Sequence, residues 1–149
     1  MVENERLTAR QAEALRVELE ELEGPRRTEI VAAIKKAREF GDLSENFEYH
    51  AAKNEQGFLE AKIRTLRARL DLSEIVEEAS KDAVGIGSVV DVADESGETM
   101  TVEISALGGT GTVSPTSPLG SALMGKAVGE TVEVSAPRGA WKATVRAIR

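Results

Sequence analysis

The sequence contains no cysteine, and this absence excludes several kinds of site. A chain without a thiol has no disulfide framework, no thiolate metal site and no cysteine nucleophile. The single histidine, His50, excludes a multi-histidine metal cage and argues against a Ser-His-Asp triad. No apolar run approaches the ~18 residues of a membrane span, and the charged start MVENERLTAR is unlike a signal peptide. We therefore expect a cytoplasmic protein without a membrane partner.

Acidic residues outnumber basic ones, and aromatic residues are scarce. The chain has 26 acidic and 19 basic side chains, for a formal net charge of -7. This balance argues against broad, nonspecific binding to duplex DNA, which needs a basic face. There are one tryptophan, one tyrosine and three phenylalanines among 149 residues, a length that suits one ordinary domain or two small ones.

A change of composition near residue 80 predicts two domains, residues 1–80 and 81–149. The first part is rich in Glu, Leu, Ala, Arg and Lys, which favour helices. The second part is rich in Val, Thr and Gly and holds three of the four prolines, which is typical of strands and turns. The expected fold class is therefore α+β, with a helical domain followed by a sheet domain.

The first part predicts two long helices in an antiparallel hairpin. Apolar residues recur every three or four positions along residues 15–37 and again along residues 59–70. This narrow seam is typical of a coiled coil. Thr8 suits the N-cap of the first helix, and Pro25 should kink or locally unwind it. A short polar segment, residues 41–46, joins the two seams and forms the tip of the hairpin.

The second part predicts a small antiparallel sheet with one short helix. Four segments between residues 87 and 148 alternate apolar and polar side chains, as half-buried strands do. Ser117 as N-cap, Pro118 at the first helical position and Gly125 as a stop predict the helix. The Gly-rich stretch 106–116 reads as a loop, without the context of a phosphate-binding loop.

The predicted tip region, residues 41–48, carries the most suggestive carboxylates, Asp42 and Glu45. A loop on a rigid projection is a common place for function. Two carboxylates suit Mg²⁺ but are too few for a tight site, so they would complete a site whose other ligands come from a partner. The same spacing also fits a capping box, in which Asp42 caps the next helix and Glu45 reaches back. Spacing alone leaves both interpretations open.

Other polar residues near the tip carry weaker signals. Ser44 and Asn46 are ordinary turn residues. Lys35, Lys36, Arg38 and Lys53 could form a basic strip that follows a nucleic-acid backbone, or they could be ordinary solvated charges.

Three long segments resemble one known family. Residues 37–63, AREFGDLSENFEYHAAKNEQGFLEAKI, closely resemble the signature of the bacterial Gre transcript-cleavage factors of the GreA type. Residues 117–134, SPLGSALMGKAVGETVEV, resemble the C-terminal signature of that family, and residues 7–22 resemble its opening. The resemblance implies an N-terminal antiparallel coiled coil and a C-terminal domain similar to FK506-binding prolyl isomerases.

The resemblance also implies an activity. Gre factors bind RNA polymerase, pass their coiled coil through its secondary channel and stimulate its Mg²⁺-dependent cleavage of backtracked RNA. A member is a transcription elongation factor that acts in trans, so it is not an enzyme by itself. Its partners would be RNA polymerase and the 3′ end of the nascent RNA. We expect a monomer with no tightly bound cofactor, which shares Mg²⁺ with the polymerase.

The resemblance assigns roles to particular residues. The two acidic tip positions of the family fall on Asp42 and Glu45, as catalytic residues and Mg²⁺ ligands, and the tip serine falls on Ser44 in a supporting role. Arg38 and Lys53 are candidates for the basic patch that contacts RNA. The residues expected to dock on the polymerase are Ser117, Pro118, Leu119 and Gly120.

Two alternatives stay open. The chain could be a Gre-like regulator that occupies the polymerase channel without promoting cleavage. Two departures from the family favour this interpretation. The family commonly has an Arg-Pro pair where this chain has Arg27 and Thr28, with its proline earlier, at Pro25, and the stretch before the C-terminal signature, which is usually longer, is here the short segment 108–113. Retention of both Asp42 and Glu45 speaks against it. The second alternative is a chaperone-like module made of a coiled-coil hairpin and an isomerase-like domain.

Overall fold

The computed structural model describes residues 5–41 and 46–149, which form two compact units. The hairpin unit contains residues 13–72. The sheet unit contains the described residues up to 12 together with residues 73–149. The composition predicts one boundary near residue 80, whereas the units divide the chain twice, because strand β1 pairs with β2 and joins the N-terminal segment to the sheet unit.

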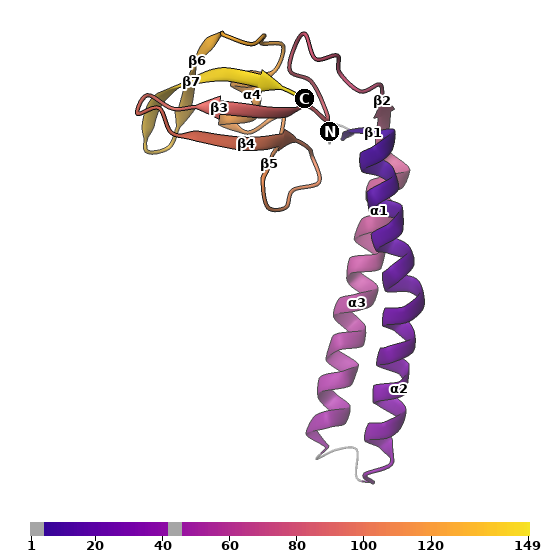
Figure 1. Cartoon of the computed structure of the whole chain (residues 1–149). Helices are drawn as coiled ribbons and strands as arrows, with labels where there is room; N and C mark the ends of the chain where they lie inside the picture. Colours follow the sequence, from indigo (N-terminus) through magenta and orange to yellow (C-terminus); the bar gives the residue numbers. More distant parts are fainter. Residues whose placement is uncertain (1–4, 42–45) are drawn as a thin grey trace. The chain divides into compact units, whose positions relative to one another are not determined.

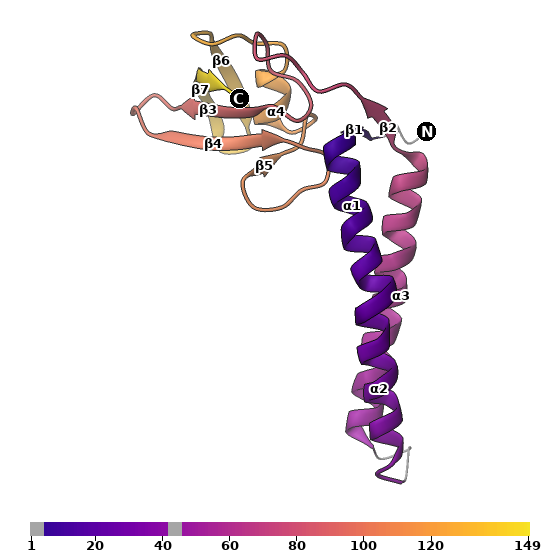
Figure 2. The same ribbon diagram turned by 45° about the vertical axis from the view of Figure 1, so that its right-hand side comes forward.

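The hairpin unit is built from helices that lie side by side in Figures 1 and 2. The first limb of the hairpin continues through a short π-helical segment, η1, and α3 returns beside it, as the seam pattern predicts. The helical segments are α1 (Ala9–Glu21), η1 (Leu22–Arg26), α2 (Arg27–Arg38) and α3 (Phe47–Leu72).

Proline explains the π-helical segment in the first limb. Pro25 lies inside η1 and has no backbone N–H to donate, so the regular α-helical hydrogen-bond ladder cannot pass through it. The Thr28 hydroxyl donates to the Gly24 carbonyl at 3.1 Å. The predicted local unwinding at Pro25 is therefore confirmed.

The hairpin unit has a narrow apolar seam with ion pairs along it. The seam cluster consists of Ile30, Ile34, Ala52, Leu59 and Ile63. Because two helices bury only one face each, charged side chains from the two limbs meet beside the seam. These cross-limb ion pairs are Arg27–Glu60 and Arg67–Glu23, each at 2.8 Å, Lys62–Glu18 at 3.2 Å and Arg26–Glu55 at 3.8 Å.

The sheet unit contains a five-stranded sheet with the order β5-β4-β3-β7-β6. Neighbouring strands are antiparallel except β5, which is parallel to β4. The prediction of a purely antiparallel sheet is therefore wrong at this edge. Positive φ at Gly108 and Gly111 lets the chain turn back before β5. The strands are β3 (Val89–Ala93), β4 (Thr99–Ile104), β5 (Thr112–Val113), β6 (Thr131–Ala136) and β7 (Gly139–Ile148).

The core of the sheet unit lies between the sheet and the short helix α4 (Pro118–Leu123). Leu123 is fully buried and packs in one cluster with Val90, Val92, Ile104 and Val145. Alternate residues of β3 point into this cluster, as the period-two pattern predicts. The α+β organisation expected from the composition is confirmed.

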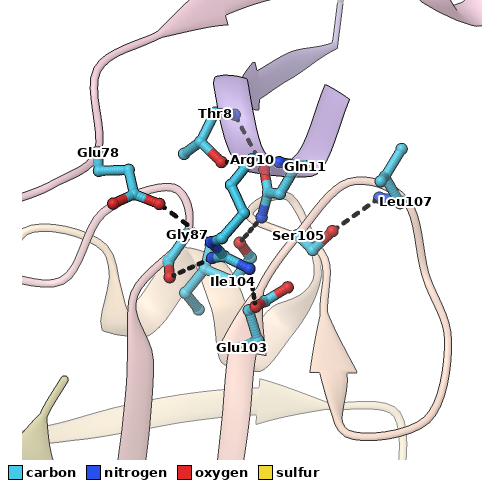
Figure 3. Close-up of polar contacts among 9 residues, drawn as sticks. All are labelled: Thr8, Arg10, Gln11, Glu78, Gly87, Glu103, Ile104, Ser105 and Leu107. Atoms are coloured by element: carbon cyan, nitrogen blue, oxygen red, sulfur yellow. Dashed lines mark hydrogen bonds and ion pairs between the residues drawn. The ribbon is translucent and has the colours of Figure 1, made fainter. Parts of the chain in front are cut away.

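A polar clamp, made of Thr8, Arg10, Gln11, Glu78 and Glu103, fastens the start of α1 inside the sheet unit (Figure 3). Thr8 Oγ1 accepts from the Gln11 backbone N–H at 3.2 Å, and Gln11 Oε1 accepts from the Thr8 N–H at 3.1 Å. This reciprocal pair is a capping box, and it confirms Thr8 as the N-cap. Gln11 is buried, and its Nε2 donates to the Ile104 carbonyl of β4 at 3.0 Å.

Arg10 completes the polar clamp. Its guanidinium contacts Glu78 at 3.1 Å and Glu103 at 3.2 Å, and donates to the Gly87 carbonyl at 3.4 Å (Figure 3). Next to the clamp, β1 (Arg6–Thr8) pairs in parallel with β2 (Glu74–Val76). Of the helices in the described part of the chain, none is both long and apolar enough to cross a membrane.

Candidate functional site at the hairpin tip

Three of the predicted site residues, Asp42, Ser44 and Glu45, lie outside the described residues. The structure describes the two helix ends on either side of them. α2 ends at Arg38, and the Gly41 N–H donates to the Arg38 carbonyl at 3.3 Å. Gly41 has a φ of +99°, a conformation that favours glycine and terminates the limb.

Asn46 is the N-cap of α3. Its Oδ1 accepts from the Tyr49 backbone N–H at 3.0 Å, and its Nδ2 donates to the Ala37 carbonyl at 2.6 Å. The first bond satisfies an orphan donor of α3, and the second ties the start of α3 to the end of α2. The prediction that Asp42 caps this helix is therefore wrong, because α3 begins at Phe47 with Asn46 before it.

The two residues predicted for the basic patch lie near the same ring. The Arg38 guanidinium lies 5.8 Å from the centroid of Tyr49, within the range of a cation–π contact. Lys53 follows Tyr49 by one helical turn, and its ammonium donates to Gln56 Oε1 at 3.0 Å. Arg38 therefore contacts Tyr49, and Lys53 lies one helical turn after Tyr49 on α3.

Charge is distributed unevenly along the hairpin. Nearer the sheet unit in sequence, Arg16, Arg26, Arg27, Lys62 and Arg67 each form an ion pair. Among the described residues, no ion pair is formed by the cations near the tip, which are Lys35, Lys36, Arg38 and Lys53. The tip end of the hairpin therefore keeps positive charge that is available to a partner.

The donors available to a metal at the tip are carboxylates. Residues 5–41 and 46–149 contain no group of three or more histidine, aspartate or glutamate side chains that could hold a metal ion. Asp42 and Glu45 would add two carboxylates, whose oxygen atoms suit Mg²⁺ but are too few for a closed site. This donor set fits a metal ion only when a partner supplies further ligands.

The predicted docking residues have different environments in the sheet unit. Ser117 is the N-cap of α4, since its Oγ accepts from the Gly120 N–H at 3.1 Å. Leu119 packs against the core, and Gly120 is buried. Pro118 is exposed. Of the four, Pro118 is therefore the residue with a side chain most accessible to a partner.

A shallow hollow lies beside Pro118. It has a volume of about 340 Å³ and is formed by α4 and β6. Hydroxyl groups and one carboxylate give it a polar lining. Its lining residues are Thr116, Pro118, Ser121, Ala122, Glu133 and Ser135.

Sequence reasoning missed two elements that shape this chain. Asn46 was classed as a turn residue, although an asparagine directly before a helix is a strong N-cap signal. The polar clamp was also missed. Thr8-x-x-Gln11 matches the capping-box pattern. The bond from Gln11 to the Ile104 carbonyl, however, joins residues distant in sequence, so no local pattern indicates it.

Comparison with known proteins matches two parts of the chain to families of transcription elongation factors. Residues 5–75 match the family described as transcription elongation factor, N-terminal. Residues 79–149 match the family described as transcription elongation factor, GreA/GreB, C-terminal. The two matches cover nearly the whole chain.

Individual relatives agree. Transcription elongation factor GreA of Streptococcus sanguinis is 43% identical over 142 residues, which cover 91% of this chain and 89% of the relative. The GreA protein of Caldanaerobacter subterraneus is 42% identical over 151 residues, covering 96% of each. A solved structure of the transcription factor Gfh1 is 31% identical with a TM-score of 0.50, over 100% of this chain and 99% of that one. The chain therefore belongs to the GreA/GreB family of transcription elongation factors.

Proposed function

We propose that this protein binds RNA polymerase and stimulates the polymerase to cleave backtracked nascent RNA. The observation that carries the proposal is the position of Asp42 and Glu45 in the short connection between α2 and α3. Since Asn46 caps α3, these carboxylates are not required to start that helix. Family membership supplies the transcriptional context.

The hairpin unit would carry the carboxylates to the polymerase active centre. α3 has 26 residues, which at ~1.5 Å per residue makes it roughly 39 Å long. A projection of this length can enter a channel that a whole domain cannot. The protein would then act in trans, by adding side chains to a catalytic centre that belongs to its partner.

At that centre, the tip residues would have distinct tasks. Asp42 and Glu45 would hold a Mg²⁺ shared with the polymerase, and Ser44 would support them through its hydroxyl. When bound, the ion would supply an activated water and stabilise charge on the leaving oxygen. The contribution of this chain would be two carboxylates in the connection between α2 and α3, and Asn46 joins the facing ends of these two helices.

Arg38 and Lys53 would contact the RNA. Both are cations without an ion pair among the described residues, so neither has to leave a carboxylate before it binds a phosphate. Phosphate contacts of this kind hold a single strand without reading its sequence.

The sheet unit would dock on the polymerase through the segment that contains Ser117, Pro118, Leu119 and Gly120. Pro118 would make the direct contact, since it is exposed beside the hollow between α4 and β6. The other three residues would act by holding α4 in place, through the N-cap of Ser117, the core contact of Leu119 and the buried backbone of Gly120.

Transcript cleavage in stalled, backtracked complexes of the cognate polymerase tests the proposal. Wild type is compared with Asp42→Asn, and the melting temperature of both proteins is measured. Asparagine remains a good helix cap but is a poor Mg²⁺ ligand. We expect cleavage to collapse while melting is unchanged.

The same assay distinguishes the alternative regulator. If wild type binds the polymerase and slows nucleotide addition but leaves the transcript intact at saturating protein, it occupies the channel without promoting cleavage. That result would refute the cleavage proposal and leave membership in the family unaffected.

A further inference from the structure

Aromatic side chains are concentrated at the tip end of the hairpin. Four of the five aromatic residues, Phe40, Phe47, Tyr49 and Phe58, lie between positions 40 and 58. The three phenylalanines are exposed, with 65% of Phe40, 88% of Phe47 and 77% of Phe58 accessible to solvent. None of the three belongs to either apolar core cluster.

Exposure of this kind has a physical cost. Apolar surface in water is unfavourable by about 25 cal/mol per Å², and neighbouring exposed apolar side chains commonly mark a binding surface. A phenylalanine also presents a flat π-face, on which a nucleobase of any sequence can stack. The phenylalanines nearest the tip, Phe40 and Phe47, therefore suit a single-stranded nucleic acid.

Phe40 and Phe47 lie at the same end of the hairpin. Phe40 follows the last turn of α2, and its N–H donates to the Ala37 carbonyl at 3.2 Å. Phe47 is the first residue of α3 and follows Asn46, whose Nδ2 donates to the same Ala37 carbonyl at 2.6 Å. One carbonyl thus holds the backbone near both aromatic residues.

Phe40 and Phe47 lie among charged residues of both signs. Lys35 and Lys36, in the last turn of α2, form no ion pair with any described residue. The carboxylates at this end are Glu39, Asp42, Glu45 and Glu48, and neither Glu39 nor Glu48 pairs with these lysines. Available cations beside exposed aromatic rings are the usual composition of a single-strand binding surface.

Phe58 provides an internal contrast. It lies eleven residues after Phe47 on α3, which is about three turns, so the two rings share a face of the helix. Phe58 borders a hollow of about 250 Å³ together with Arg26 and Lys62. Arg26 is paired with Glu29 at 2.8 Å, and Lys62 is paired with Glu18. The ring is equally exposed, but its neighbouring cations are already neutralised.

We propose that Phe47, together with Phe40, is a stacking platform for bases of single-stranded RNA, with Lys35 and Lys36 contacting the phosphates. The inference rests on the proposed function in one respect only, that the RNA is the unpaired 3′ segment of a backtracked transcript. It adds a base-binding surface to the phosphate contacts of Arg38 and Lys53.

The test measures the affinity of the full-length protein for backtracked complexes of the cognate polymerase. Two complexes are compared, one with ordinary RNA and one whose unpaired 3′ segment carries abasic ribonucleotides. The variants are Phe47→Leu, Phe40→Leu and Phe47→Trp, with Phe58→Leu as the matched control. Leucine keeps an apolar side chain and a good helix former but removes the aromatic face.

We expect Phe47→Leu to weaken binding about 10-fold on ordinary RNA, and Phe40→Leu to weaken it less. On abasic RNA the wild type should be weaker by at least that factor, because stacking on both rings is lost, and Phe47→Leu should cause no further loss. Phe47→Trp should restore binding, and Phe58→Leu should bind like wild type on both RNAs.

Two results would overturn the inference. One is unchanged affinity in both Phe47→Leu and Phe40→Leu. The other is equal weakening by Phe47→Leu on ordinary and abasic RNA, which would show that the ring contacts the polymerase itself. Because affinity is measured apart from cleavage, a wild type that binds but does not stimulate cleavage would refute the proposed function and leave the stacking result readable. A wild type that does not bind the complex would refute both.

Discussion

The hairpin unit and the sheet unit bury their apolar side chains in different ways. In the hairpin unit a single seam of small and aliphatic residues runs between two limbs, and ion pairs lie along it. In the sheet unit the strands and α4 surround a cluster whose central side chains are inaccessible to solvent. A narrow seam leaves most of each helix exposed, so the hairpin presents many side chains to a partner, whereas the sheet unit derives more stability from packing.

Matched truncations of leucine give the largest expected effect. Leu123, in the core of the sheet unit, is 0% exposed, and Leu59, in the hairpin seam, is 7% exposed. We expect Leu123→Ala to lower the free energy of unfolding of its unit by about 4 kcal/mol, and Leu59→Ala by about 2 kcal/mol, because a two-helix seam can close partly over the lost volume. Amide hydrogen exchange of the full chain reports both units. Equal losses would contradict the contrast between the two cores.

Replacing one glycine in each unit with alanine is expected to change the stability of the two units in opposite directions. A Cβ on Gly120 would lie 1.8 Å from the Ser114 carbonyl oxygen, whereas a Cβ on Gly57 of α3 would have nothing within 4 Å. We expect Gly120→Ala to destabilise the sheet unit by about 3 kcal/mol. Gly57→Ala should stabilise the hairpin unit by about 0.5–1 kcal/mol, because alanine is the better helix former. Denaturant unfolding measures both, and a destabilised Gly57→Ala variant would show that this face of α3 is not open.

The hairpin could be predicted from the sequence because its determinants are local. A three-and-four apolar repeat, a proline inside a helix and a threonine before one act through neighbouring residues, and each has the predicted consequence at the seam, at Pro25 and at Thr8. The edge strand β5 was not predicted, because two residues after a Gly-rich turn carry no alternation from which to infer a parallel partner.

The candidate site was only partly predictable. The family resemblance predicts Arg38 and Lys53 as the basic patch, and in the structure Arg38 contacts Tyr49 while Lys53 donates to Gln56. The role of Asn46 was missed because Asp42 offered an equally good capping pattern four residues earlier. Asn46 makes an additional hydrogen bond to the Ala37 carbonyl of α2, which favours it as the cap. Because this bond joins two helices, no local sequence pattern indicates it.

A smaller effect is expected at the polar clamp, which belongs to the sheet unit although it holds the start of a helix. Gln11→Glu keeps an acceptor for the Thr8 N–H but removes the Nε2 donor to the Ile104 carbonyl. The variant should lose at least about 1–3 kcal/mol of stability in the sheet unit, because the Ile104 carbonyl loses its donor and a carboxylate is buried in place of an amide. Gln56→Glu is the control and should be neutral, because Gln56 is only half-buried on α3 and a carboxylate can still accept from Lys53. If Gln11→Glu is also neutral, the capping box alone fastens this turn.

The ion pairs of the hairpin give the smallest expected effect, which appears as a dependence on pH. The hydrogen bond from Arg27 holds the pKa of Glu60 below its ordinary value of 4.5, and Arg67 does the same for Glu23. Because the folded-state pKa of each carboxyl is depressed, its contribution to stability is present above pH 4.5 and is lost as the pH falls through the folded value. Both carboxylates are partly exposed to solvent, so each contribution is small and should weaken further in high salt. Hydrogen exchange of α3 at pH 6 and pH 3.5 should show a loss of protection that Glu60→Gln reduces. An identical pH dependence in Glu60→Gln and wild type would mean that the pairs beside the seam contribute nothing to holding the two limbs together.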